Sequence, residues 1–149
     1  MTALGDFSSG DVLTAADLNA IGTWTSFTPS FTNFTLGNGT IERAIYSKVN
    51  ELVFVQLYVT LGSTSSMGTS PSFTAPVGAA DSSQLATGVG RARISSSFFW
   101  IYPYMSDDDV IMYCVDAASS YARRATITSS VPATWGSGSD FQINMVYQA

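Results

Sequence analysis

The residue types that most often perform catalysis are scarce in this chain. The sequence contains no histidine, which removes Ser-His-Asp and Cys-His catalysis and histidine-ligated zinc sites. Its single lysine, Lys48, directly follows Ser47. Adjacent residues on a strand point to opposite faces, so these two side chains are not expected to form a Ser-Lys dyad. We therefore predict no catalytic residues and no cofactor.

The acidic residues are dispersed rather than paired. Glycoside hydrolysis needs two carboxyl groups that converge in a cleft, but Glu42 falls in a predicted strand and Glu51 in a predicted turn. A pairing across the fold stays open, and no motif marks one. Asp107, Asp108 and Asp109 are consecutive and offer the oxygen ligands that Ca²⁺ prefers. Because consecutive residues seldom converge on one ion, we favour a solvated hairpin tip and predict no metal site.

The chain has one cysteine, Cys114, which excludes an internal disulfide and a cysteine metal cluster. It lies within the apolar run 110–115. We predict that it is a buried small hydrophobic residue.

The most distinctive side chains are aromatic. In the segment 98–105 they alternate with Phe99, Ile101 and Pro103, and they form what we call the aromatic row: Phe98, Trp100, Tyr102 and Tyr104. One interpretation is core packing on one side of a strand and a cross-strand ladder on the other. We favour a subunit interface, because aromatic rings are enriched in interface cores. A platform for stacking carbohydrate is a third, less favoured interpretation.

Short apolar segments separated by turn residues supply the elements that position these groups. We predict about eight strands, in the segments 24–34, 41–47, 52–61, 85–94, 98–105, 110–115, 123–131 and 141–147, with a loop over 62–76. Pro29 confines the first of these segments to a sheet edge or an irregular arm. Both faces of 52–61 are apolar, which predicts a central strand covered on both sides. The regular spacing of turns favours a mainly β fold, a jelly-roll-like antiparallel β-sandwich.

One short helix is predicted before the first strand. Thr14 suits its N-cap, Asp17 can complete a capping box, and Gly22 marks its end. Only about two helical turns fit between Thr14 and Gly22, and a helix this short is only marginally stable in water by itself. Its apolar residues Leu13, Leu18 and Ile21 therefore need a surface, in this chain or in a partner. We divide the chain into an N-terminal arm, residues 1–22, and a β-sandwich domain, residues 23–149.

Composition limits the possible partners. Charged residues make up 11% of the 149 residues, against about 25% in typical domains. A net charge of −5 and few basic residues argue against nucleic acid and anionic membranes. The pairs Arg91/Arg93 and Arg123/Arg124 could form a small basic spot, but we favour solvated arginines at strand edges. No apolar run approaches the roughly 18 residues of a membrane helix. A surface rich in Ser, Thr, Asn and Gly suits an extracellular or virion protein.

Three segments carry a resemblance to a known group of proteins. They are Gly-Asp-Val-Leu-Thr-Ala-Ala-Asp-Leu-Asn-Ala-Ile-Gly-Thr-Trp near the start, Gly-Asn-Gly-Thr-Ile-Glu-Arg-Ala-Ile-Tyr-Ser-Lys-Val-Asn-Glu-Leu-Val-Phe-Val, and the ending Trp-Gly-Ser-Gly-Ser-Asp-Phe-Gln-Ile-Asn-Met-Val-Tyr-Gln-Ala. These resemble small surface proteins of tailed-bacteriophage virions: tail-fibre, minor-tail and head-decoration proteins. Asn50 stands where that group usually has Gly before the valine-rich strand.

The resemblance implies a virion protein, made in the host cytoplasm, that forms a homotrimer. It also implies attachment to another virion protein, capsid or tail, through the arm, and the docking residues expected there are Leu13, Thr14, Asp17, Leu18 and Ile21. Because no shaft-like repeat follows residue 22, we favour a capsid-decoration or head-fibre knob. The alternative is a tail-fibre or minor-tail protein that binds a host receptor or glycan. A polysaccharide-degrading enzyme is the least favoured role.

Overall fold

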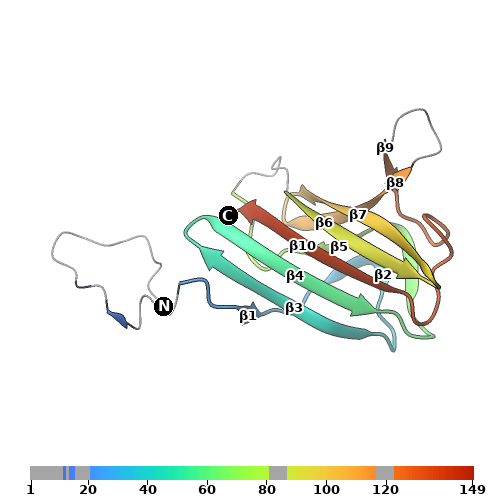
Figure 1. The fold of residues 1–149 in the computed structure, drawn as a ribbon, viewed down its shortest axis with the longest axis horizontal. Helices are drawn as coiled ribbons and strands as arrows, with labels where there is room; N and C mark the ends of the chain where they lie inside the picture. Colours follow the sequence, from blue (N-terminus) through green and yellow to red (C-terminus); the bar gives the residue numbers. More distant parts are fainter. Residues whose placement is uncertain (1–11, 13, 16–20, 81–86, 117–122) are drawn as a thin grey trace.

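The computed structural model describes residues 12, 14–15, 21–80, 87–116 and 123–149. These residues form ten strands, which Figure 1 labels in chain order. The strands are β1 (Thr25–Ser26), β2 (Phe31–Thr35), β3 (Thr40–Val49), β4 (Leu52–Thr60), β5 (Ser66–Thr74), β6 (Thr87–Ile94), β7 (Ser97–Ser106), β8 (Asp109–Asp116), β9 (Arg123–Thr126) and β10 (Asp140–Gln148).

The strands belong to one antiparallel sheet. Their order is β1-β3-β4-β10-β6-β7-β8-β5-β2, with β9 paired to β8. The sheet curls, so that β2 and β5 lie behind the layer formed by β3, β4, β10 and β6 (Figure 1). Phe34 of β2 meets Phe141 of β10 across the interior, with ring centroids 5.7 Å apart. The prediction of a mainly β, antiparallel fold is confirmed.

Buried apolar side chains at every second position of the central strands β4 and β10 form much of the core. Val53, Val55, Leu57 and Val59 of β4 are all buried, and β10 adds Phe141, Ile143 and Met145 on the same side. Side chains of a strand alternate between its faces, so every second residue faces the interior. We call the opposite side, directed away from the core, the outer face.

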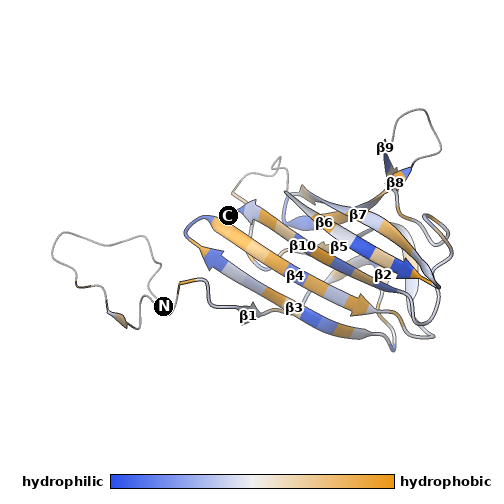
Figure 2. Ribbon diagram, viewed as in Figure 1, coloured by the Kyte–Doolittle hydropathy of each residue, from blue (hydrophilic) through white to orange (hydrophobic). Residues whose placement is uncertain are grey.

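The outer face of β4 is not covered within this chain. Strand β4 is central, between β3 and β10, as predicted. Leu52 and Phe54, however, are exposed large hydrophobic residues. The expectation that both faces of this strand are covered is therefore wrong for a single chain. Figure 2 shows β4 as hydrophobic along most of its length, because apolar side chains occupy both of its faces.

The segment 62–76, predicted to be a loop, contains β5. This strand pairs with β2 along much of its length and with β8 through three residues, 72–74. Gly68, Pro71 and several serines hide the alternation, and Ser70 has a positive φ of 54°. Phe73 is nevertheless fully buried. Tertiary pairing overrides the weak strand propensity of this sequence.

The turns before and after β3 each contain a residue with a positive φ value. Asn50 has a φ of 53°, a left-handed conformation that asparagine accepts more readily than most residues other than glycine. In the turn 36–39 the residue with a positive φ is Gly37, at 57°. The Asn38 side chain accepts a hydrogen bond from the Thr64 backbone N–H at 2.9 Å. It thereby ties this turn to the one that follows β4.

The predicted helix falls mostly on positions 13 and 16–20, which lie outside the described residues, and it stays a prediction. The proposed docking residues Leu13, Asp17 and Leu18 lie there too. Of the other two, Thr14 and Ile21 are both exposed. Val12 is 82% exposed. The described residues include no helix long and apolar enough to span a membrane.

Candidate functional site

The aromatic row lies on the outer face of β7. Phe98, Trp100 and Tyr102 are 60%, 61% and 44% exposed, and Tyr104 is half-buried. On the opposite side of the same strand, Ile101 and Met105 are completely buried. The row is therefore surface rather than core in a single chain.

Two arginines of β6 lie beside the row. The strand register places Arg93 opposite Phe98 and Arg91 opposite Trp100. The Arg91 guanidinium carbon lies 4.9 Å from the centroid of the Phe98 ring, within the range of a cation–π interaction.

These arginines cover a buried carboxylate, Asp140, whose side chain is 1% exposed. Both Nε and Nη2 of Arg93 lie 2.6 Å from its Oδ2. The Arg91 Nη2 lies 4.0 Å from Oδ1, and Oδ1 has no hydrogen bond to the described residues. Arg91 and Arg93 are partly solvated, with side chains 41% and 45% exposed, but they lie on β6 between β10 and β7 rather than at a sheet edge, and both face a buried acid. Asp140, predicted to lie in a loop, is the first residue of β10.

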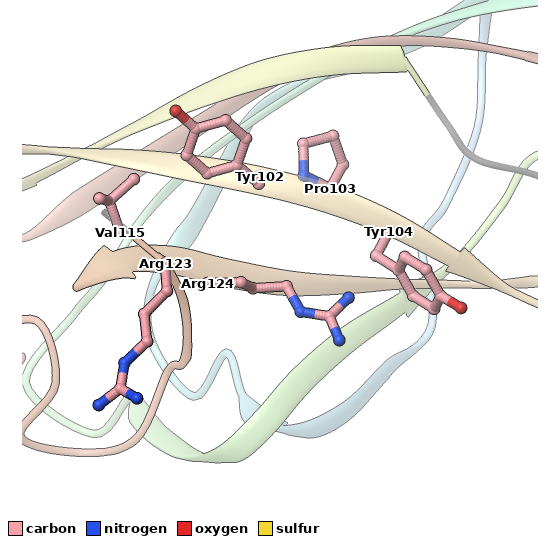
Figure 3. Close-up of a pocket in the computed structure, with 6 residues that line it drawn as sticks. All are labelled: Tyr102, Pro103, Tyr104, Val115, Arg123 and Arg124. Atoms are coloured by element: carbon pink, nitrogen blue, oxygen red, sulfur yellow. The ribbon is translucent and has the colours of Figure 1, made fainter. Parts of the chain in front are cut away.

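A pocket opens at the other end of the row, between β7, β8 and β9. Its volume is about 320 Å³, and we call it the tyrosine–arginine pocket; its lining residues are Tyr102, Pro103, Tyr104, Val115, Arg123 and Arg124. In Figure 3, Arg124 extends from β9 toward Tyr104, whereas Arg123 points away from it.

Two tyrosine rings hold Arg124 in place. Its guanidinium carbon lies 4.1 Å from the Tyr113 ring centroid and 5.0 Å from that of Tyr104. The two rings meet edge to face, 6.2 Å apart at 81°, a favoured aromatic geometry. Arg123, by contrast, donates from Nε to Asp116 Oδ2 at 3.3 Å. The two arginines of this pair therefore have different surroundings.

Of the three consecutive aspartates, Asp107 and Asp108 form the turn between β7 and β8, and Asp109 begins β8. Asp108 Oδ1 accepts a hydrogen bond from the Ala79 backbone N–H at 3.1 Å, and Asp109 Oδ1 accepts one from the Thr74 hydroxyl at 3.3 Å. These carboxylates tie a hairpin turn to the segment after β5. No cluster of three or more acidic or cysteine residues able to hold a metal ion occurs among the described residues.

The remaining candidate nucleophiles are separated or buried. Ser47 is buried whereas Lys48 is exposed, so the pair points to opposite faces as predicted. Cys114 is 1% exposed, which confirms its assignment to the core. Burial raises the pKa of its thiol, and the Asp116 carboxylate acts in the same direction.

Comparison with known proteins gives no relative from which a role can be transferred: no family model, curated protein or solved structure matches the chain. The candidate site therefore depends on its own geometry.

Sequence reasoning named the aromatic row but missed the polar residues that accompany it. Asp140 and Tyr113 were not singled out, and Arg124 was named only as a solvated arginine, because no motif links positions so far apart. One signal was available: both arginine pairs and the aromatic segment lie in strands. The strand register, which brings them together, comes only from the fold.

Proposed function

We propose that this chain is a non-enzymatic bacteriophage virion protein, a homotrimeric capsid-decoration or head-fibre knob. Its arm, residues 1–22, attaches it to the particle, and its β body is displayed as a jelly-roll-like sandwich. One observation carries the proposal: large apolar side chains stay uncovered both on the outer face and at the described positions of the arm. The resemblance of the three sequence segments to virion proteins supplies the biological setting.

The outer face is the proposed surface of self-association. Its exposed large hydrophobic residues come from β4, β6 and β7: Leu52, Phe54, Val89, Phe98, Trp100 and Tyr102. Soluble monomers rarely expose large contiguous apolar patches, and aromatic and arginine side chains are enriched in interface cores. We place Phe98 and Trp100 within the interface, and Tyr102 and Tyr104, which line the tyrosine–arginine pocket, at its edge.

The arm is the proposed attachment segment. Val12 and Ile21 of the arm are exposed, as is Trp24 two residues after it, so these side chains do not complete the core of their own chain. A partner surface on the particle would remove them from water, at about 25 cal/mol per Å² of apolar area. The docking residues Leu13, Thr14, Asp17, Leu18 and Ile21 stay part of this proposal.

A tail-fibre or minor-tail role is the second candidate. The observation that favours it is the tyrosine–arginine pocket, which a purely architectural protein does not need. In that role the protein would be present in few copies per particle and would contact a receptor or glycan of the host.

Self-association is tested by sedimentation equilibrium of the purified chain and of Trp100→Ser. We expect a trimer for the wild type and a shift toward monomer for Trp100→Ser, with unchanged far-UV circular dichroism. Val131→Ser removes an exposed apolar residue outside the ten strands and should leave the trimer intact. A wild type that sediments as a monomer would overturn the trimeric assembly.

Attachment is tested with a variant that lacks residues 1–22. We expect a folded β body that no longer associates with particles. Tailless heads that retain the full-length protein support the decoration role, whereas protein found only on tails supports the second candidate. Normal attachment of the truncated protein would contradict the role of the arm.

A further inference from the structure

The tyrosine–arginine pocket holds a cation, Arg124, that forms no ion pair with the part of the chain that the structure describes. The Arg124 side chain has no hydrogen bond or ion pair with the described residues, whereas Arg91 and Arg93 face Asp140, and Arg123 contacts Asp116. Arg43 donates to the Gln56 side chain at 3.2 Å. Among the arginines, Arg124 therefore keeps its donors available for a ligand.

The guanidinium of Arg124 is also fixed in orientation. Tyr113 and Tyr104 contact it at 4.1 and 5.0 Å, which restricts the long side chain before any ligand arrives. A planar guanidinium presents its N–H groups in a fork that matches a carboxylate in two parallel hydrogen bonds. Holding that fork in place lowers the entropy lost on binding.

The rest of the pocket is suited to a ring. Tyr102, Pro103 and Val115 line it with apolar surface, and its volume of about 320 Å³ lies at the lower end for small-molecule sites. A bare inorganic anion would leave this apolar surface without a contact. The chain is acidic overall, with a net charge of −5, so Arg124, which has no ion pair with the described residues, makes a local exception that favours a negatively charged ligand.

From these contacts we propose that the tyrosine–arginine pocket binds the carboxylate-bearing ring of an acidic saccharide, a uronate. The carboxylate accepts two hydrogen bonds from Arg124, and the face of the sugar ring packs on the Tyr102 side chain. The inference goes beyond the structural role proposed above, because it applies whether the protein sits on the head or on the tail.

Nuclear magnetic resonance of the ¹⁵N-labelled full-length protein tests this binding, with D-glucuronate as the probe. We expect saturable shifts of backbone amides on β7, β8 and β9 and of the Arg124 Nε–H group. D-Glucose, which has no carboxylate, should cause no saturable shift at equal concentration. Sodium acetate, a carboxylate without the ring, should bind at least about tenfold more weakly than D-glucuronate.

Substitutions locate the site. Arg124→Met keeps much of the apolar stem but removes the donors, and it should weaken D-glucuronate binding by about tenfold or more. Arg43→Met removes the same charge from a distant position on β3 and should leave the affinity unchanged. Equal affinity of Arg124→Met and wild type would overturn the proposal. So would an absence of saturable binding, or acetate binding as tight as that of D-glucuronate.

The test of D-glucuronate binding can be separated from the test of self-association. Trp100→Ser lies outside the lining of the pocket and should keep D-glucuronate binding while weakening self-association. Arg124→Met should show the reverse. Failure of the trimer therefore does not imply failure of the saccharide site, and each claim can be rejected by itself.

Discussion

The guanidinium of Arg93 contacts a single oxygen of Asp140, with Nε and Nη2 each 2.6 Å from Oδ2. Asp140 begins β10 and Arg93 lies opposite it on β6, so the pair links neighbouring strands on the outer face. The carboxylate is 1% exposed, while the Arg91 and Arg93 side chains are 41% and 45% exposed. The two arginines thus form a partly solvated lid over a buried negative charge.

This arrangement predicts a measurable loss of stability in Asp140→Asn. The substitution keeps the shape of the side chain but removes the charge that holds two arginines together. Breaking a fully buried ion pair costs about 3–5 kcal/mol. Because both arginines can return to water, we expect a decrease of about 2 kcal/mol in the free energy of unfolding, measured by urea denaturation.

Asp116→Asn is the matched control for that measurement. Asp116 contacts Arg123, whose side chain is 71% exposed, and exposed ion pairs contribute little. We expect a change of about 0.5 kcal/mol or less. If both substitutions cost the same, burial of Asp140 does not strengthen its ion pairs.

The buried hydroxyl of Tyr147 leads us to predict that the folded protein loses stability at high pH. Its hydroxyl donates to the Val77 carbonyl oxygen at 2.6 Å and accepts from the Val77 N–H at 3.3 Å. Burial, with a smaller contribution from the Asp108 carboxylate, raises the pKa of Tyr147 to about 12. In the unfolded chain a tyrosine has a pKa of about 10. The folded state therefore holds this proton more tightly than the unfolded state.

The sign of the effect follows from proton linkage. The stabilisation is fully present below pH 10 and is lost as the pH rises from about 10 to about 12, because over that range the unfolded state binds fewer protons. Two pH units correspond to about 3 kcal/mol. Urea denaturation at several pH values should show this decrease in the wild type and a smaller one in Tyr147→Phe. Parallel curves for the two proteins would contradict the assignment to Tyr147.

We predict that the Cys114 thiol of the folded protein reacts slowly with disulfide reagents. Its side chain is 1% exposed, and its raised pKa keeps the thiolate, the reactive form, scarce. We expect labelling by a disulfide reagent at pH 8 to be much slower than labelling of glutathione, and to accelerate as urea approaches the unfolding midpoint. Labelling of the native protein as fast as that of glutathione would show that the thiol is accessible.

The sequence by itself determined which strands are clearest and which side chains each one buries. Alternation of Val53, Val55, Leu57 and Val59 predicts one face of β4, and that face is buried, because the side-chain period of a strand is fixed at two residues. Turn residues such as Asn50 were also readable, since few residues accept a positive φ. The burial of Cys114 follows from its apolar neighbours.

Only the tertiary structure decided which distant side chains meet. Pairing of β10 with β6 brings Asp140 to Arg93, and pairing of β8 with β9 brings Tyr113 close to Arg124. Neither contact has a local signature, because register between strands far apart in sequence depends on the packing of the whole sheet. The same packing makes a serine-rich segment with weak strand propensity form the strand β5, which pairs with β2 and β8. It also left the outer faces of β4 and β7 uncovered, which period two alone cannot show, since alternation defines two faces but not what lies against each.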